Sequence, residues 1–253
     1  MGLPVRKAAF SPSFEPCTSD SDILSPMLQA ARVRVGARPA ALLALLPLAL
    51  AAQTTVAIDN PRVRILSAVE APHQPTPLHK HDFNRVAIYL DSGDQDISHP
   101  GADTEHLHWK AGDVAWMPGG AMHISEVVGS APLRMVEIEI KQPAPPSPPK
   151  RTPKLDPLVI DSAHNKLIFE NPQVRVFRST RNPGDREKWH EHAGAGRAVV
   201  LLSDLSARIE SANGKLSSMS GAPGDAFWTD GYIKHRATNL GTQLSDLIIV
   251  EVK

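Results

Sequence analysis

The sequence predicts an all-β protein built from two tandem copies of one β domain. Three observations favour this fold class. After residue 60, apolar residues form short runs with a period of two, typical of strands with one buried face. The chain holds 23 prolines and 16 glycines, which favour frequent turns over long helices. Finally, the same series of short segments occurs twice in the same order.

The repeat is clear when the two halves are aligned. Residues 60–65, "NPRVRI", recur 111 positions later as "NPQVRV". The paired histidines also keep the offset of 111, and after them the offset is 112, which indicates one extra residue after the second pair. An internal repeat of this length indicates two copies of one structural unit. The matched segments are 85–90 with 197–202, 111–116 with 223–228, and 134–141 with 246–253.

Between the copies lies a segment that cannot join the interior of a sheet. Residues 141–157, "KQPAPPSPPKRTPKLDP", include seven prolines, a composition that favours extended polyproline II structure. We therefore predict a first domain at 53–141, a Pro-rich linker at 142–156 and a second domain at 157–253.

The N-terminal region has the pattern of a secretory signal peptide. Three arginines between Arg32 and Arg38 precede the apolar run 40–52, "AALLALLPLALAA", which is too short to span a bilayer. Met27 lies at the usual distance in front of such a basic region. We therefore expect 27–52 to be a signal peptide and 1–26 to be a disordered extension or an incorrect start. A buried helix in a cytoplasmic protein is the alternative. The expected location is periplasmic or secreted.

Charge and cysteine content limit the classes of partner. The formal net charge is zero, so nothing favours nucleic acid or an anionic membrane surface as a partner. The only cysteine, Cys17, precedes the predicted signal peptide, so the two domains hold no disulfide and no thiolate ligand. After signal cleavage we expect no membrane association, and the fused pair is compatible with a monomer or a homodimer.

Histidines at matching places in both copies indicate metal binding. His79 and His81 are separated by one residue, so they share a face if the chain is extended there. A third histidine, His123, follows about forty residues later and could complete a facial set. The copies repeat the pattern, and the matching residues are His190, His192 and His235.

These motifs resemble those of the cupins. The first cupin motif has His-x-His, then three or four residues, then a glutamate, and the second reads G-x5-P-x-G-x2-H-x3-N. Residues Gly112, Pro118, Gly120 and His123 fit the second motif, although Val127 replaces its asparagine. The second copy keeps the glycine, histidine and asparagine at Gly224, His235 and Asn239, while Asp230 and Tyr232 replace the proline and glycine.

The resemblance covers nearly all of 58–253 and implies a bicupin: two tandem double-stranded β-helix, or jelly-roll, barrels with metal inside. The wider pattern is similar to the small cupins described as β-alanine-degradation-protein-like. That kinship implies a fold and a pocket more than a reaction.

One departure from the cupin pattern affects the chemistry. Arg85 and Arg197 stand at the two places allowed for the ligand glutamate, and a guanidinium cannot coordinate a metal. Three interpretations follow. Three histidines hold the metal alone while the arginine binds an anionic substrate; the arginine repels the cation and the site stays empty; or the arginine points outward.

We expect the first interpretation to hold, with Fe, Zn, Ni or Cu bound because imidazole suits these metals. The chain would then be a metal-dependent enzyme of oxygenase or isomerase type that acts on a small organic anion. The alternative is a non-catalytic protein that binds a small acid or sugar without a functional metal. The degenerate second motif favours the first copy as the working site.

Overall fold

The computed structural model describes residues 53–144, 146, 155–192 and 194–253. These residues form strands β1–β17 and one short helix, α1 (Pro157–Ile160), so the all-β prediction is confirmed. The predicted extension 1–26, the predicted signal peptide 27–52 and most of the predicted linker 142–156 lie outside the described residues. Within the described part, no helix has the length and apolar character needed to cross a membrane.

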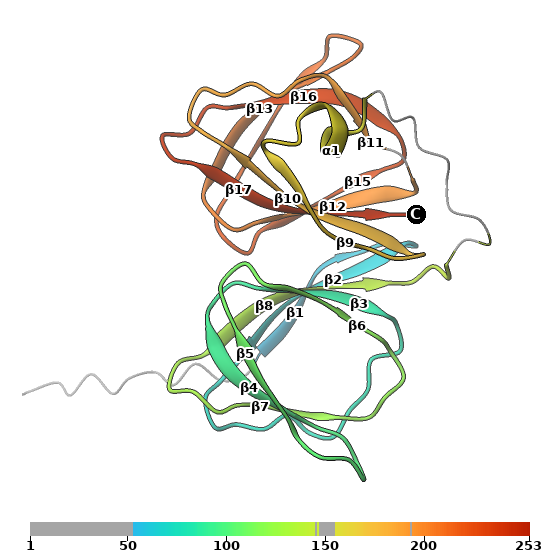
Figure 1. Cartoon of the computed structure of the whole chain (residues 1–253), viewed down its shortest axis with the longest axis vertical. Helices are drawn as coiled ribbons and strands as arrows, with labels where there is room; N and C mark the ends of the chain where they lie inside the picture. The colour runs from blue at the N-terminus through green and yellow to red at the C-terminus, as the bar shows by residue number, and fades with distance from the viewer. Residues whose placement is uncertain (1–52, 145, 147–154, 193) are drawn as a thin grey trace, which may run out of the picture. The chain divides into compact units, whose positions relative to one another are not determined.

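The first half forms a barrel from two antiparallel sheets (Figure 1). One sheet has the strand order β1-β2-β8-β3-β6 and the other the order β5-β4-β7. The strands are β1 (Gln53–Asp59), β2 (Val63–Glu70), β3 (Arg85–Tyr89), β4 (Gly93–Ser98), β5 (Glu105–Trp109), β6 (Val114–Met117), β7 (Ile124–Val127) and β8 (Leu133–Ile140).

The second half repeats this arrangement. Its sheets have the orders β15-β12-β17-β10-β9 and β11-β16-β13-β14. The strands are β9 (Asn165–Glu170), β10 (Val174–Arg181), β11 (His190–His192), β12 (Gly196–Leu201), β13 (Leu205–Ser211), β14 (Leu216–Gly221), β15 (Ala226–Asp230), β16 (Ile233–Asn239) and β17 (Ser245–Val252). We call the two halves the first and the second barrel.

Strands β8 and β17 are buried on both faces, and this places polar residues inside the barrels. In β8, Val136, Ile138 and Ile140 belong to a fully buried apolar cluster that also contains residues of the second barrel. Because side chains alternate along a strand, Glu137 and Glu139 point the other way, into the first barrel. The alternation in "RMVEIEI" thus serves an apolar interface on one face and a polar cavity on the other.

Candidate metal centre

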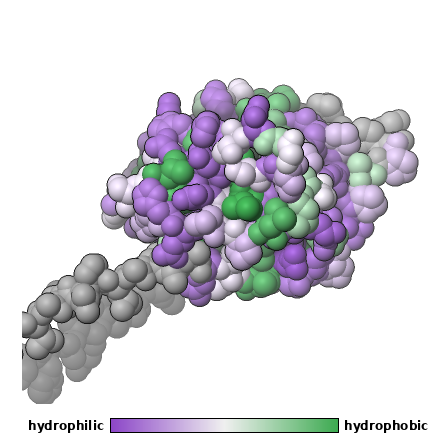
Figure 2. Space-filling view, turned by 90° about the horizontal axis from the view of Figure 1, so that it is seen from below, coloured by the Kyte–Doolittle hydropathy of each residue, from purple (hydrophilic) through white to green (hydrophobic). Residues whose placement is uncertain are grey.

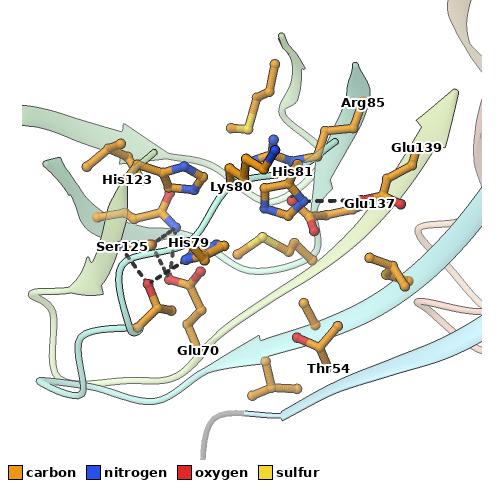
Figure 3. Close-up of a pocket in the computed structure, with 18 of the residues that line it drawn as sticks. Thr54, Glu70, His79, Lys80, His81, Arg85, His123, Ser125, Glu137 and Glu139 are labelled. Atoms are coloured by element: carbon orange, nitrogen blue, oxygen red, sulfur yellow. Dashed lines mark hydrogen bonds and ion pairs between the residues drawn. The ribbon is translucent and has the colours of Figure 1, made fainter. Parts of the chain in front are cut away.

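The structure brings the six predicted histidines together as two triads. His79 and His123 are antiparallel partners, with backbone N···O hydrogen bonds of 3.0 and 2.8 Å between them. In the second barrel the same relation joins His190 on β11 to His235 on β16. In each triad, one ring nitrogen from every histidine lies within 4.8 Å of the others. Figure 3 shows the rings of the first triad turned towards one another.

Backbone carbonyls orient three of these rings, and the longest of these contacts joins Nδ1 of His123 to the carbonyl oxygen of Ala121 at 3.4 Å. The Nδ1 atom of His79 lies 2.8 Å from the carbonyl oxygen of Pro77, and that of His190 lies 3.0 Å from the carbonyl oxygen of Lys188. A carbonyl oxygen only accepts hydrogen bonds, so each Nδ1 carries the proton. In a neutral imidazole the other nitrogen, Nε2, then holds a lone pair that can bind a metal.

Carboxylates orient the second histidine of each triad. Nδ1 of His81 lies 3.3 Å from Oε1 of Glu139, and Nδ1 of His192 lies 2.7 Å from Oε1 of Glu251. A carboxylate that accepts from Nδ1 is a frequent outer partner of a metal-bound histidine, because it fixes the ring and makes Nε2 more basic.

The geometry of the second triad fits a bound cation. The Nε2 atoms of His190 and His192 lie 3.1 Å apart, although both Nδ1 atoms face acceptors. Two lone pairs at this distance repel each other unless a proton or a metal ion lies between them, so the pair is suited to share a cation. Nitrogens that bind one metal at roughly 2.0–2.1 Å and at right angles would be about 3.0 Å apart. The donor set is therefore that of a divalent transition metal site.

Burial favours the neutral form of four of these histidines, which is the form that binds a metal. Burial lowers the pKa of His123 to about 4 and the pKa of His192 to about 3. It likewise lowers the pKa of His81 and of His235 below the ordinary histidine value. The Coulombic effect of the neighbouring histidines and arginine acts in the same direction as burial on His123 and His235.

Both arginines are buried beside the triads, which contradicts the interpretation in which they point outward. Arg85 is 6% exposed, and its Nε atom donates to Oε1 of Glu137 at 2.6 Å. Arg197 is 4% exposed, and its Nη2 atom lies 3.4 Å from Nε2 of His235. Their predicted role in binding a substrate stays a prediction.

Sequence reasoning did not identify the carboxylates that face these sites. Glu139 accepts from Nε of Arg64 at 2.6 Å as well as facing His81. The second barrel repeats this pair, with Arg175 donating to Glu251 at 2.7 Å. The sequence did hold a signal for these carboxylates: Glu139 and Glu251 occupy equivalent positions in the matched segments 134–141 and 246–253.

A hydrogen-bonded wall distinguishes the first barrel. Ser125 Oγ donates to Oε2 of Glu70 at 2.7 Å, and Gln95 Nε2 donates to the same oxygen at 3.0 Å. Gln95 Oε1 in turn accepts from Tyr89 Oη at 3.1 Å and from Trp109 Nε1 at 2.8 Å. Glu70 does not belong to the group of residues whose ligand atoms lie close enough to share one metal ion. Its carboxylate lines the cavity separately from the triad.

The two barrels offer very different amounts of space. The first triad borders a cavity of about 370 Å³ that also contains Arg85 and Glu70, whereas the cavity at the second triad measures about 60 Å³. The second cavity is also less polar. Ala207 and Ala237 occupy the strand positions that Gln95 and Ser125 occupy in the first barrel.

A more apolar cavity of about 390 Å³ also reaches the first triad. It includes Trp109 and Trp116, and it shares four lining residues with the polar cavity: Arg85, Ile97, Met117 and His123. The first triad is therefore bordered by polar space on one side and by apolar space on another.

Comparisons with known proteins identify the fold. No family model matches the chain, and no curated protein matches its sequence. Among solved structures, Bacillus subtilis oxalate decarboxylase, described with Mn(II) centres, is 13% identical with a TM-score of 0.57 and covers 79% of this chain and 72% of its own. AerE from Microcystis aeruginosa is 14% identical with a TM-score of 0.55 and covers 80% of this chain and 97% of its own.

A salicylate 1,2-dioxygenase from Pseudoaminobacter salicylatoxidans is 12% identical, has a TM-score of 0.53 and covers 75% of this chain and 70% of its own. At these identities the comparisons establish the fold alone. The predicted tandem cupin-type jelly-roll barrels are thus confirmed. The narrower similarity to β-alanine-degradation-protein-like cupins stays a prediction.

Proposed function

We propose that the first barrel is a metal-dependent active site that acts on a small organic anion, in an oxygenase- or isomerase-type reaction. His79, His81 and His123 would hold the divalent metal. The observation that carries this proposal is that these three rings converge beside a cavity of about 370 Å³. An oxalate decarboxylase described with Mn(II) centres and a salicylate 1,2-dioxygenase among the structural neighbours support the proposal, because they place chemistry on small organic acids on the same fold.

The metal would supply Lewis acidity or an oxygen-binding centre. The chain's own residues would orient the ligand. Glu137 engages Nε of Arg85, so the Nη groups of this guanidinium stay available to a carboxylate of the substrate. Glu70, held through Oε2 by Ser125 and Gln95, would accept a hydrogen bond or a proton from a donor group of the substrate.

The adjoining apolar cavity would receive a hydrophobic part of the substrate. Trp109 and Trp116 lie along it, and Arg85 and His123 border both cavities. An organic anion with an apolar or aromatic body would match this division, because its charged end would face the triad and its body would avoid water.

The expected location outside the cytoplasm is part of the proposal. It depends on the signal-peptide pattern of 27–52. N-terminal sequencing of the exported protein should give a first residue close to Gln53. Retention of 27–52 in an exported or cytoplasmic product would contradict this location.

A non-catalytic binding role is the alternative, and one observation favours it. The wall formed by Glu70, Gln95 and Ser125 offers fixed hydrogen-bonding groups of the kind that bind hydroxyl-rich ligands. This alternative predicts that ligand affinity survives a chelator and is lost in Arg85→Ala.

A screen for activity tests the enzyme directly. Protein reconstituted with each of Fe(II), Mn(II), Zn(II), Ni(II) or Cu(II) would be incubated with a panel of aliphatic and aromatic organic acids. Oxygen uptake and product formation would be measured for the wild type, His123→Ala and the matched second-barrel variant His235→Ala. Turnover that is lost in His123→Ala but kept in His235→Ala supports the proposal. Turnover that survives His123→Ala contradicts it.

A further inference from the structure

The second barrel contains a buried positive charge whose matching partner has been replaced. Arg197 is 4% exposed, and its Nη1 atom has no hydrogen-bond partner among the described residues. Within the part of the chain that the structure describes, the Nη2 atom contacts Nε2 of His235 at 3.4 Å and no carboxylate. Glu251, which lies opposite Arg197 in the strand register, and Glu187 attract this charge, but neither accepts a hydrogen bond from it among the described residues. Because a buried donor without an acceptor is costly, Nη1 is a binding point for an added anion.

The first barrel shows what has been removed. There the equivalent guanidinium, Arg85, is paired with Glu137 at 2.6 Å. The strand register places Glu137 opposite Ala87 and places Ile249 opposite Val199, so Ile249 occupies the position of Glu137 in the second barrel. The chain has thus exchanged the carboxylate that neutralises the arginine for an apolar side chain.

The carboxylates that remain near Arg197 are engaged by other groups. Glu251 is bound by Arg175 at 2.7 Å and by His192 at 2.7 Å. Glu187 lies 3.7 Å from both Arg181 and His190. Neither forms an ion pair with Arg197 among the described residues.

The available space selects the size of the added anion. The cavity of about 60 Å³ is lined by apolar side chains that include Val199, Leu205 and Met219. A water molecule needs roughly 10–15 Å³ on this measure, so the cavity has room for about four waters. A bulky substrate therefore does not fit, whereas an anion of one to three heavy atoms does.

We propose that the second barrel is a separate site for a small anion, such as formate, azide or a halide. The anion would lie between Arg197 and a metal ion held by His190, His192 and His235. Because Nη2 lies 3.4 Å from Nε2 of His235, one short anion could contact both the guanidinium and a metal held by the triad. It would supply the negative ligand that this barrel lacks.

The first barrel does not have this feature, since Glu137 already accepts from Arg85 and the cavity is larger. The proposal is also independent of any reaction in the first barrel. Removing the first triad should leave the second-barrel anion site intact, so the two proposals succeed or fail separately.

Anion binding at the second barrel can be measured in the full chain once the first triad has been disabled. In the full chain, His79→Gln and His81→Gln would be combined to disable the first triad, and the protein would be loaded with Co(II). Sodium formate and sodium azide would be titrated at constant ionic strength, with perchlorate as the balancing salt, while the visible spectrum of Co(II) is recorded. We expect a saturable spectral change with either anion. Failure to bind Co(II), or a spectrum insensitive to both anions, would overturn the proposal.

Two further variants in the same background identify the anchor. Arg197→Gln should weaken formate binding at least about tenfold while Co(II) stays bound, because it removes a charge-assisted hydrogen bond. Ile249→Glu should give Arg197 an internal partner and abolish the formate response. Arg197→Lys, which keeps the charge but loses the planar fork, should give intermediate affinity and replaces Arg197→Gln if that variant does not fold. Unchanged formate affinity in the folded arginine variant and in Ile249→Glu would contradict the assignment.

Discussion

Nδ1 of His192 lies 2.7 Å from Oε1 of Glu251, and the first barrel repeats this relation between His81 and Glu139 at 3.3 Å. Each carboxylate holds its histidine in the tautomer that presents Nε2 to the centre of the triad. The recurrence of the pair in both barrels, with an arginine on the second carboxylate oxygen each time, indicates that orienting this ring is a shared requirement of the two sites.

Glu139→Gln should therefore weaken metal binding in the first barrel by about 10–100-fold, the usual effect of removing such a partner. The substitution keeps the side-chain volume, and Arg64 is partly exposed, so the fold should tolerate it. Zinc affinity would be measured by competition with a chromophoric chelator in a His190→Gln, His192→Gln background. Asp91→Asn, which alters an exposed ion pair with Arg134, is the control. An affinity within about threefold of the parent would contradict the role of Glu139.

Glu70 should affect ligand handling without affecting metal content. Its carboxylate is not among the ligand atoms that lie close enough together to share one metal ion. Glu70→Gln should thus keep the metal equivalents of the wild type, whereas His123→Ala should lose those of the first barrel. Elemental analysis of both variants after identical reconstitution checks this. Metal lost to the same extent in Glu70→Gln would mean that Glu70 is itself a ligand.

For the buried Arg85–Glu137 ion pair, removing one partner should cost more stability than removing both. Glu137→Leu alone leaves a buried guanidinium without its carboxylate and should lower the free energy of unfolding by about 3–5 kcal/mol. Combining it with Arg85→Leu should recover much of that loss, since no uncompensated charge then remains. Urea unfolding of the two single variants and the double variant gives the coupling. Additive losses in the double variant would show that the two charges are not coupled.

The metal-free protein should lose stability as the pH falls below about 6.5. Burial holds the pKa of His123 at about 4 and that of His192 at about 3, whereas both approach 6.5 in the unfolded chain. Between these values the unfolded state binds more protons, so acid favours unfolding, by at most about 1.4 kcal/mol per pH unit for each histidine.

Urea midpoints of chelator-treated protein at pH 7.0, 6.0 and 5.0 would test this dependence. His192→Gln should give a smaller decrease with acid than the wild type, because its contribution to proton uptake is removed. A decrease of the same size in both proteins would contradict the assignment.

Metal-loaded protein should lose more stability than metal-free protein over this range, because protons also compete for the ligands.

Part of this architecture could be predicted from the sequence because it is encoded by local periodicity and by the repeat. The i, i+2 spacing of His79 and His81 gave their shared face, and the duplication gave the matching triad. The positions of Glu137 and Ile249 carried no such signal. Each lies within an apolar strand motif, and its significance appears only when the strand pairing brings it beside an arginine.

The polar wall of the first barrel was also beyond sequence reasoning. Glu70, Gln95 and Ser125 come from three strands that are distant in the sequence, and their hydrogen bonds depend on how the two sheets close. The second copy has alanines at two of these positions, so the repeat gave no support for them. The difference between the copies, rather than their similarity, marks the first cavity as the larger and more polar one.

Metal stoichiometry tests the central claim most directly. The purified protein would be stripped with a chelator, reconstituted with an excess of Zn(II) or Mn(II), freed of unbound metal and measured by elemental analysis, alongside a His79→Ala, His123→Ala variant. We expect the first barrel to bind about one equivalent of metal per chain. The variant should lose this equivalent and retain any metal bound in the second barrel. Less than about a tenth of an equivalent in the wild type, or equal metal content in both proteins, would contradict a metal centre at His79, His81 and His123.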